Sequence, residues 1–160
     1  MSNLIVSGQP FAYPDPGTEP GWGEDATGWA KAVTDLLASL VTTGDILQTT
    51  FAVQNNISSA EDVVGMFFDS GTVRSAQISY SVHRISDSVP AGVSEAGVIT
   101  IVLNDTAASG QKWQMMQTKE GNAGIAFSIG DGGQFQYIAT DMGALDYSGT
   151  LKFSAKVLNK

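Results

Sequence analysis

Most of the chain after residue 44 consists of short segments with the period-two alternation of apolar and polar residues expected of half-buried β-strands. The clearest segment spans residues 73–85, where serine, glutamine and histidine alternate with alanine, isoleucine, tyrosine and valine. Further segments, alternating or continuously apolar, lie at residues 46–54, 63–69, 97–103, 111–118, 125–129, 135–139 and 150–157. About eight strands at this spacing predict a mainly β fold, an antiparallel β-sandwich or jelly roll over residues 44–160.

One turn between these segments can be assigned from its residues. Asp131, Gly132 and Gly133 separate two alternating segments, and an Asp-Gly pair in that setting is a strong hairpin signal. The glycine-rich stretches at residues 121–124 and 130–133 lack the lysine and hydroxyl residue of a phosphate-binding loop and open no helix. We therefore expect both stretches to be hairpin turns.

Residues 25–43 carry a helical pattern instead. Apolar residues recur at the spacing of one helix face at Trp29, Val33, Leu36, Leu37 and Leu40. Asp25 or Thr27 can cap the start of this helix, and Gly44 can end it. A helix of this length is not stable alone, so we expect one short α-helix whose apolar face packs on a sheet or on other copies of the chain.

Residues 1–24 follow neither pattern. Four of the five prolines lie there, interleaved with glycines and with the aromatic residues Phe11, Tyr13 and Trp22. Proline fixes φ and favours extended geometry in the residue before it, so the sequence predicts an irregular, extended N-terminal arm. Aromatic side chains on such an arm need a surface to cover, either on the parent domain or on a partner.

Charge and composition narrow the classes of function. The formal net charge is −8 and no basic cluster is present, so we expect no binding to nucleic acid. The absence of cysteine removes disulfides and thiolate metal sites. The first residues have neither the basic nor the long apolar stretch of a signal peptide or membrane helix, so we expect a soluble protein with no membrane partner.

The sequence offers few candidates for catalysis or metal binding. The one histidine, His83, lies on the polar side of the segment at residues 73–85, beside Arg84 and with no second histidine to complete a metal site. Acidic residues lie mostly at predicted turns, where aspartate bonds its own backbone: Asp62, Asp69, Asp87, Glu95, Asp105, Asp131, Asp141 and Asp146. A calcium site between two such turns stays open. We expect no enzyme activity, no cofactor and no metal.

Two parts of the chain carry the main resemblance to known proteins, which spans most of the chain and also includes Phe68–Asp69 before Val73–Ala76 and Ser94–Val98. The first is Tyr13–Gly17 with Trp22–Ala30 and Val33–Leu37, and the second is Gly133–Tyr137 with Tyr147–Lys156. Together they resemble the opening and closing parts of small virion proteins of tailed bacteriophages. The resemblance implies a structural component of the particle: a head decoration or cement protein, a head-fibre base or a tail-associated subunit. It also implies a homotrimer with a β-sandwich body.

The leading hypothesis is a decoration protein that binds and stabilises a bacteriophage capsid. The arm and helix would contact the major capsid protein and neighbouring copies of the chain, in a virion assembled in the host cytoplasm. The residues expected at those contacts are Phe11, Tyr13, Trp22, Trp29, Leu36 and Leu40. Further surface contacts, or simply solvated strand positions, are Arg74, Lys152 and Lys156.

The alternative hypothesis is a tail fibre or receptor-binding subunit whose loops contact glycans on a host surface. The candidate sugar contacts are Trp113, Tyr137 and Asp141. Trp113, with Met115 and Met116, has two interpretations: an exposed apolar patch, or a strand with one face in the core. A third hypothesis, a small hydrolase, would have to rely on carboxylates or serines alone.

Overall fold

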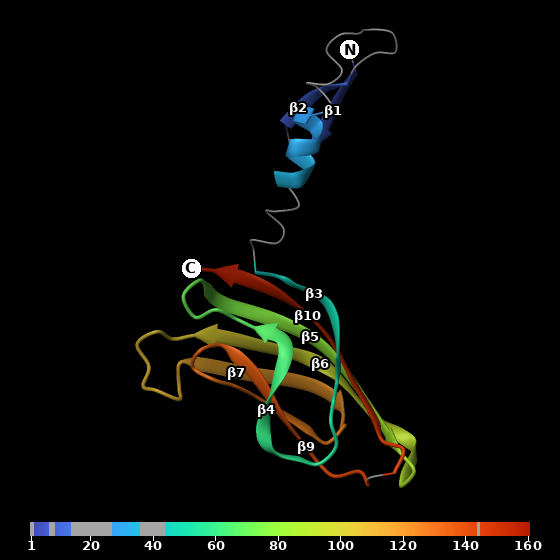
Figure 1. The fold of residues 1–160 in the computed structure, drawn as a ribbon. Helices are drawn as coiled ribbons and strands as arrows, with labels where there is room; N and C mark the ends of the chain where they lie inside the picture. Colours follow the sequence, from blue (N-terminus) through green and yellow to red (C-terminus); the bar gives the residue numbers. More distant parts are fainter. Residues whose placement is uncertain (1, 7–8, 14–26, 36–43, 144) are drawn as a thin grey trace. The chain divides into compact units, whose positions relative to one another are not determined.

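The computed structural model describes residues 2–6, 9–13, 27–35, 44–143 and 145–160. The chain divides into two units, Met1–Thr43 and Gly44–Lys160, each with its own secondary structure. Figure 1 shows the elements coloured along the chain from blue at the N-terminus to red at the C-terminus.

The N-terminal unit contains a β-hairpin. β1 (Ser2–Val6) pairs antiparallel with β2 (Gln9–Tyr13), and Pro10 lies opposite Ile5. These residues are paired strands and not the irregular backbone that the prolines predicted for residues 1–24. Both strands of a two-stranded ribbon are edges, where the missing N–H of a proline is tolerated.

A helical segment follows in the same unit. Residues 27–35 are helical and lie within the helix predicted over residues 25–43. The predicted apolar stripe can be followed only as far as Val33, because residues 36–43 fall outside the part of the chain that the structure describes. Residues 14–26 of the predicted arm also fall outside it. Packing of the arm and helix on a partner stays a prediction.

The C-terminal unit is a sandwich of two antiparallel sheets (Figure 1). The large sheet has the order β3-β10-β5-β6-β7, formed by Ile46–Ala52, Ser148–Asn159, Val73–Ser86, Val89–Leu103 and Trp113–Gly121. The small sheet has the order β4-β9-β8, formed by Ile57–Phe67, Gln134–Ala139 and Ile125–Ile129. These eight strands confirm the mainly β sandwich predicted over residues 44–160.

Each predicted segment overlaps a strand, and two strands begin at least six residues earlier than predicted. β4 begins at residue 57 rather than 63, and β6 begins at residue 89 rather than 97. The added residues are mostly exposed or half-buried, so they lack the apolar side on which alternation depends. Backbone pairing with β9 and β5 holds these extensions in the sheets.

The first and last strands of the sandwich are neighbours in the large sheet. β3 pairs antiparallel with β10, with Phe51 opposite Leu151 and Thr50 opposite Lys152. β10 pairs on its other side with β5, where Leu151 lies opposite Val82. β10 therefore connects the strand that comes first in the sandwich to the centre of the large sheet.

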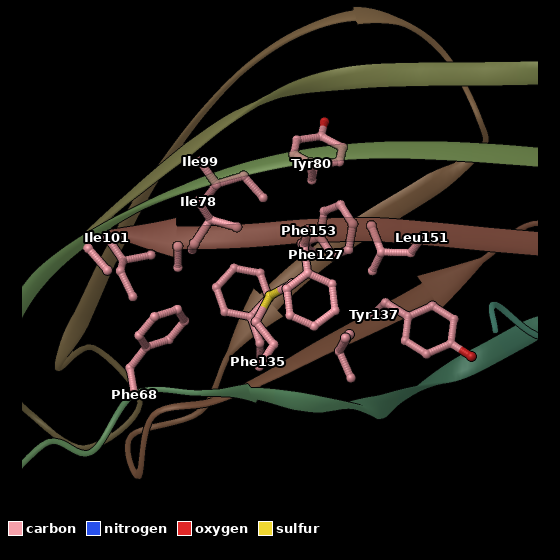
Figure 2. Packing of buried hydrophobic residues seen from close by; sticks show 14 of the residues in the cluster. Phe68, Ile78, Tyr80, Ile99, Ile101, Phe127, Phe135, Tyr137, Leu151 and Phe153 are labelled. Carbon is pink, nitrogen blue, oxygen red and sulfur yellow. The ribbon is translucent and has the colours of Figure 1, made fainter. Parts of the chain in front are cut away.

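The core lies between the two sheets and contains a chain of touching aromatic rings (Figure 2). The ring centroid of Phe135, in β9, lies 6.2 Å from that of Phe68 and 5.9 Å from that of Phe127. Phe127 makes an edge-on contact with Tyr80 of β5 at 5.2 Å. Aliphatic side chains of the large sheet pack around these rings: Ile78, Ile99, Ile101 and Leu151. The aromatic chain thus runs from one sheet to the other.

Of the two predicted hairpin turns, residues 130–133 join β8 to β9 as expected. The prediction for residues 121–124 is wrong, because this stretch connects β7 of the large sheet to β8 of the small sheet. Gly133 has a φ of 94°, and a Cβ there would collide with the carbonyl oxygen of Phe68, so the position requires glycine. The Asp131 carboxylate accepts hydrogen bonds from the Gly110 amide at 2.6 Å and the Ser109 hydroxyl at 3.1 Å. The Gly110 bond is the main cause that lowers the pKa of Asp131. Asp131 thereby fastens the β6–β7 loop to the hairpin.

Substitution of Phe135 by alanine should destabilise the sandwich strongly. Phe135 is completely buried, and its removal leaves a cavity between the two sheets. We expect Phe135→Ala to lower the free energy of unfolding by about 3–5 kcal/mol, measured by urea denaturation. Ile138→Ala is the matched control, because Ile138 lies on the same strand with 41% of its surface exposed. Equal losses in the two variants would contradict the assignment of the core.

Candidate functional site

The residues predicted at partner contacts in the N-terminal unit are only partly described. Phe11 and Tyr13 belong to β2, and Trp29 lies in the helical segment with 47% of its surface exposed. Outside the described residues lie Trp22, Leu36 and Leu40. The predicted contacts of these six residues with a partner therefore stay predictions.

The three predicted surface cations occupy different settings on the large sheet. Arg74, near the start of β5, donates from Nη1 to the Leu103 carbonyl oxygen at 3.5 Å. Lys156 of β10 forms an ion pair with Asp45 at 2.7 Å, and that hydrogen bond is the main cause that lowers the pKa of Asp45. Lys152 lies on the same face of β10 as Lys156, because even spacing along a strand returns side chains to one face.

A shallow groove crosses the outward face of the large sheet, on the side away from the core. It consists of two adjoining hollows of about 240 and 500 Å³ that share Ser81 and Lys152. The strand register places these two residues opposite each other on β5 and β10. The outward side chains around them are small or polar: Gln48, Ser79, His83, Ser94, Ala96, Thr150 and Ser154. We call this surface the hydroxyl groove.

Lys152 differs from the other basic side chains of the sandwich. Ion pairs with carboxylates are made by Lys119, Lys156 and Lys160. Arg74 and Lys112 lie close enough to Asp105 to lower its pKa, after the larger effect of a Lys160 hydrogen bond. Across the described residues of the sandwich, the side chains of Lys112 and Lys152 make no ion pair and no hydrogen bond, but Lys112 lies close to the carboxylates of Asp105 and Asp131 and Lys152 has no carboxylate beside it. Its charge is therefore open to a ligand in the hydroxyl groove.

His83 lies at one end of the hydroxyl groove and is exposed, as its place in the alternating pattern predicted. Its Nδ1 is 2.9 Å from the hydroxyl oxygen of Ser94, which lies opposite it on β6. A Cβ on Gly92 would meet the imidazole ring, so glycine leaves space for the ring there. Within the described part of the chain, no group of three histidine, aspartate or glutamate side chains is arranged to hold a metal.

A buried carboxylate lies on the core side of β6, beneath the hydroxyl groove. Glu95 accepts hydrogen bonds from Lys119 Nζ at 2.8 Å, from the Tyr80 hydroxyl at 2.7 Å and from the Ala123 amide at 3.1 Å. Burial by itself would raise the pKa of Glu95, but these hydrogen bonds together hold it below its ordinary value. Burial, together with the bond to Glu95, raises the pKa of Tyr80, so its hydroxyl stays a donor.

A buried cation, Arg84 of β5, holds one end of the sandwich. Its Nη1 donates to the Ala123 carbonyl oxygen at 2.7 Å, and its Nε donates to the Tyr147 hydroxyl at 2.9 Å. Its Nη2 donates to the Thr140 carbonyl oxygen at 2.6 Å and to Asn55 Oδ1 at 3.2 Å. These partners lie in the three connections β3–β4, β7–β8 and β9–β10, each of which crosses from one sheet to the other. Arg84 therefore fixes the large sheet to three of the four connections that cross between the sheets.

The sequence analysis missed both buried charges. Glu95 was expected at a turn, and this is wrong because it lies within β6 and is buried. The signal was present in the alternation itself. Arg84 continues the inward series that includes Tyr80 and Val82 on β5, and Glu95 shares the inward side of β6 with Ile99. A charged residue at an inward position indicates an internal hydrogen-bond network.

The candidate sugar contacts need correction. Trp113 and Tyr137 are buried in the core, which confirms the core interpretation of Trp113 and removes both residues as glycan contacts. Asp141 is exposed, and its carboxylate accepts hydrogen bonds from the side-chain amide of Asn55 at 3.1 Å and the backbone amide of Gly143 at 2.9 Å. Of the three candidate sugar contacts, Asp141 is therefore the exposed one.

The antiparallel β-sandwich is a fold that carries many unrelated functions, so the fold by itself defines an architecture and not one protein. No family model matches the chain, and no curated protein matches it. Among solved structures, it is similar to the tailspike protein of Acinetobacter phage vB_ApiP_P1, with a TM-score of 0.50 and 10% sequence identity. The similarity covers 71% of this chain and 22% of the tailspike chain. At this identity the likeness shows a shared fold.

No helix among the described residues is long and apolar enough to cross a membrane.

Replacement of Arg84 should weaken the whole sandwich. Arg84→Met leaves the buried carbonyl oxygen of Ala123 and the partly buried carbonyl oxygen of Thr140 without these donors, and we expect a loss of about 3 kcal/mol in the free energy of unfolding. Urea denaturation measures this loss. Arg74→Met is the matched control, because Arg74 is an exposed arginine on the same strand and should change stability by about 0.5 kcal/mol or less. A stable Arg84→Met protein would contradict the role of Arg84.

Stability should also fall at acid pH through Glu95. Because the folded-state pKa of Glu95 is lowered, its stabilisation is fully present above its ordinary value of 4.5 and is lost as the pH falls through the folded-state value. The free energy of unfolding of Glu95→Gln should therefore decrease less than that of the wild type between pH 6 and pH 3. Glu120→Gln, on the exposed side of neighbouring β7, is the control and should follow the wild type. Parallel curves for Glu95→Gln and the wild type would contradict the expectation.

Proposed function

We propose that this chain is a non-enzymatic structural subunit of a tailed-bacteriophage particle, on the tail side, with its sandwich as an outward-facing binding domain. The observation that carries the proposal is the likeness of its fold to part of a phage tailspike protein. The resemblance of its first and last segments to small virion proteins supports the same origin. At 10% sequence identity the comparison with the tailspike shows a shared fold only. The tail-side location of this chain is therefore part of the proposal.

The division of the chain into two units supports this role. The sandwich of residues 44–160 has its own core, and the N-terminal unit has a separate hairpin and helical segment. In the proposed arrangement the N-terminal unit attaches to other virion subunits and to further copies of the chain, forming a homotrimer. The net charge of −8 argues against nucleic acid as a partner. The virion, assembled in the host cytoplasm, is the proposed location.

A second candidate is capsid decoration, in which the N-terminal unit binds the major capsid protein and the sandwich covers the shell. The half-exposed Trp29 of the helical segment favours it, because an exposed tryptophan is a common anchor at protein interfaces. Binding to the assembled shell alone would then stabilise the shell by mass action. The two candidates differ in where the chain lies and in how many copies a particle carries.

Copy number and location on purified particles distinguish the candidates. We expect gold-labelled antibodies against the sandwich to bind at the tail, with few copies per particle relative to the major capsid protein by quantitative mass spectrometry. Labelling over the whole head at a copy number close to that of the capsid protein would instead establish decoration. Absence of the chain from purified particles would contradict both. An antibody against the major capsid protein is the control for access.

A further inference from the structure

We propose that the hydroxyl groove binds an acidic polysaccharide, with a sugar carboxylate held by Lys152. This deepens the proposed function by naming a ligand class for the outward face of the sandwich, and it rests on that function only for its biological setting. The binding site itself is argued from the charge, hydrogen-bonding groups and shape of the groove.

The charge of Lys152 is the first argument. The chain is strongly acidic, and the exposed lysines of its sandwich that lie beside carboxylates are already neutralised, as Lys156 is by Asp45. Lys152 has no such partner among the described residues and lies where the two hollows meet. Such a lysine offers a compact positive charge on a flexible stem to one anionic group. A carboxylate on the ligand supplies the partner that the chain does not.

The hydrogen-bonding groups around Lys152 are the second argument. Ser81 lies opposite Lys152, and Thr150 and Ser94 flank His83 on the neighbouring strands in the same row. Hydroxyl groups both donate and accept, so they match the hydroxyls of a sugar ring, which do the same. The second hollow continues this lining with Ser79, Ser154 and Gln48. Neutral and acidic sugars can thus both form hydrogen bonds at these positions. The positive charge of Lys152 favours the acidic sugar.

The distribution of apolar side chains argues for a saccharide rather than a protein partner. Protein interfaces usually have an apolar centre, yet the outward side chains of the groove include no large apolar residue. Exposed apolar residues of this face lie toward its other end, where Leu158 and Val102 are both opposite Ser75 and Met116 is opposite Thr100. The groove is also open and shallow, so each site would bind weakly and several copies on one particle would raise the avidity.

Titration of the purified full chain tests the proposal. The probes are polygalacturonate, which carries a carboxylate on each sugar, and dextran, which is neutral. Isothermal titration at about 0.15 M salt, where repulsion between the acidic chain and the polyanion is screened beyond about 8 Å, should show binding of polygalacturonate and none of dextran. Lys152→Ala should weaken it by about tenfold or more, which corresponds to the loss of one charge-assisted contact.

Two variants make the result specific. Lys156→Ala removes the same charge from the same face of the same strand, but from a lysine already paired with Asp45, and should change the affinity by about twofold or less. Lys152→Arg should retain most of the binding. Equal losses in Lys152→Ala and Lys156→Ala, equal binding of dextran, or no binding of polygalacturonate would each overturn the proposal. These outcomes are independent of where the chain lies on a particle, so either proposal can fail alone.

Discussion

The guanidinium group of Arg84 is the interaction on which the sandwich depends, because it donates to oxygen atoms from three of the connections that cross between the sheets. Burial of a cation is costly unless its hydrogen-bonding groups are satisfied, and charge-assisted bonds to carbonyl oxygens are among the stronger ones. With every nitrogen of the group bonded, this end of the domain is fixed without a carboxylate partner. The large sheet keeps its position relative to the small sheet as a result.

β5 connects this internal order to the outer surface. On its inward side, Tyr80 packs in the aromatic core and Arg84 bonds the connections that cross between the sheets. On its outward side, Ser81 and His83 line the hydroxyl groove. A strand bonded on both sides and packed beneath has little freedom, so the groove is preorganised and a ligand would not have to order it. The same strand thus joins the core to the proposed binding surface. Glu95, beneath the neighbouring strand, adds support from the core side.

The alternation of residues was sufficient to predict the strands, because burial of one side is what that pattern records. It placed His83 outward and predicted the hairpin at Gly133, which the backbone conformation there confirms. It did not predict the early start of β4, whose exposed residues are held by backbone pairing with β9. The groove also escaped prediction, because it depends on which strands become neighbours and not on any one segment. Arg84 was missed because its polar partners lie far along the chain.

The pairing of β3 with β10 has a consequence for synthesis on the ribosome. β3 is made before the other strands of the sandwich, yet its sheet neighbour is made last. Until β10 has emerged, β3 and one side of β5 expose unpaired backbone, and such open edges readily pair with other chains. Closure of the large sheet is therefore a late event with a long chain separation, which slows folding. Nascent chains stalled before β10 should be the form most in need of chaperones.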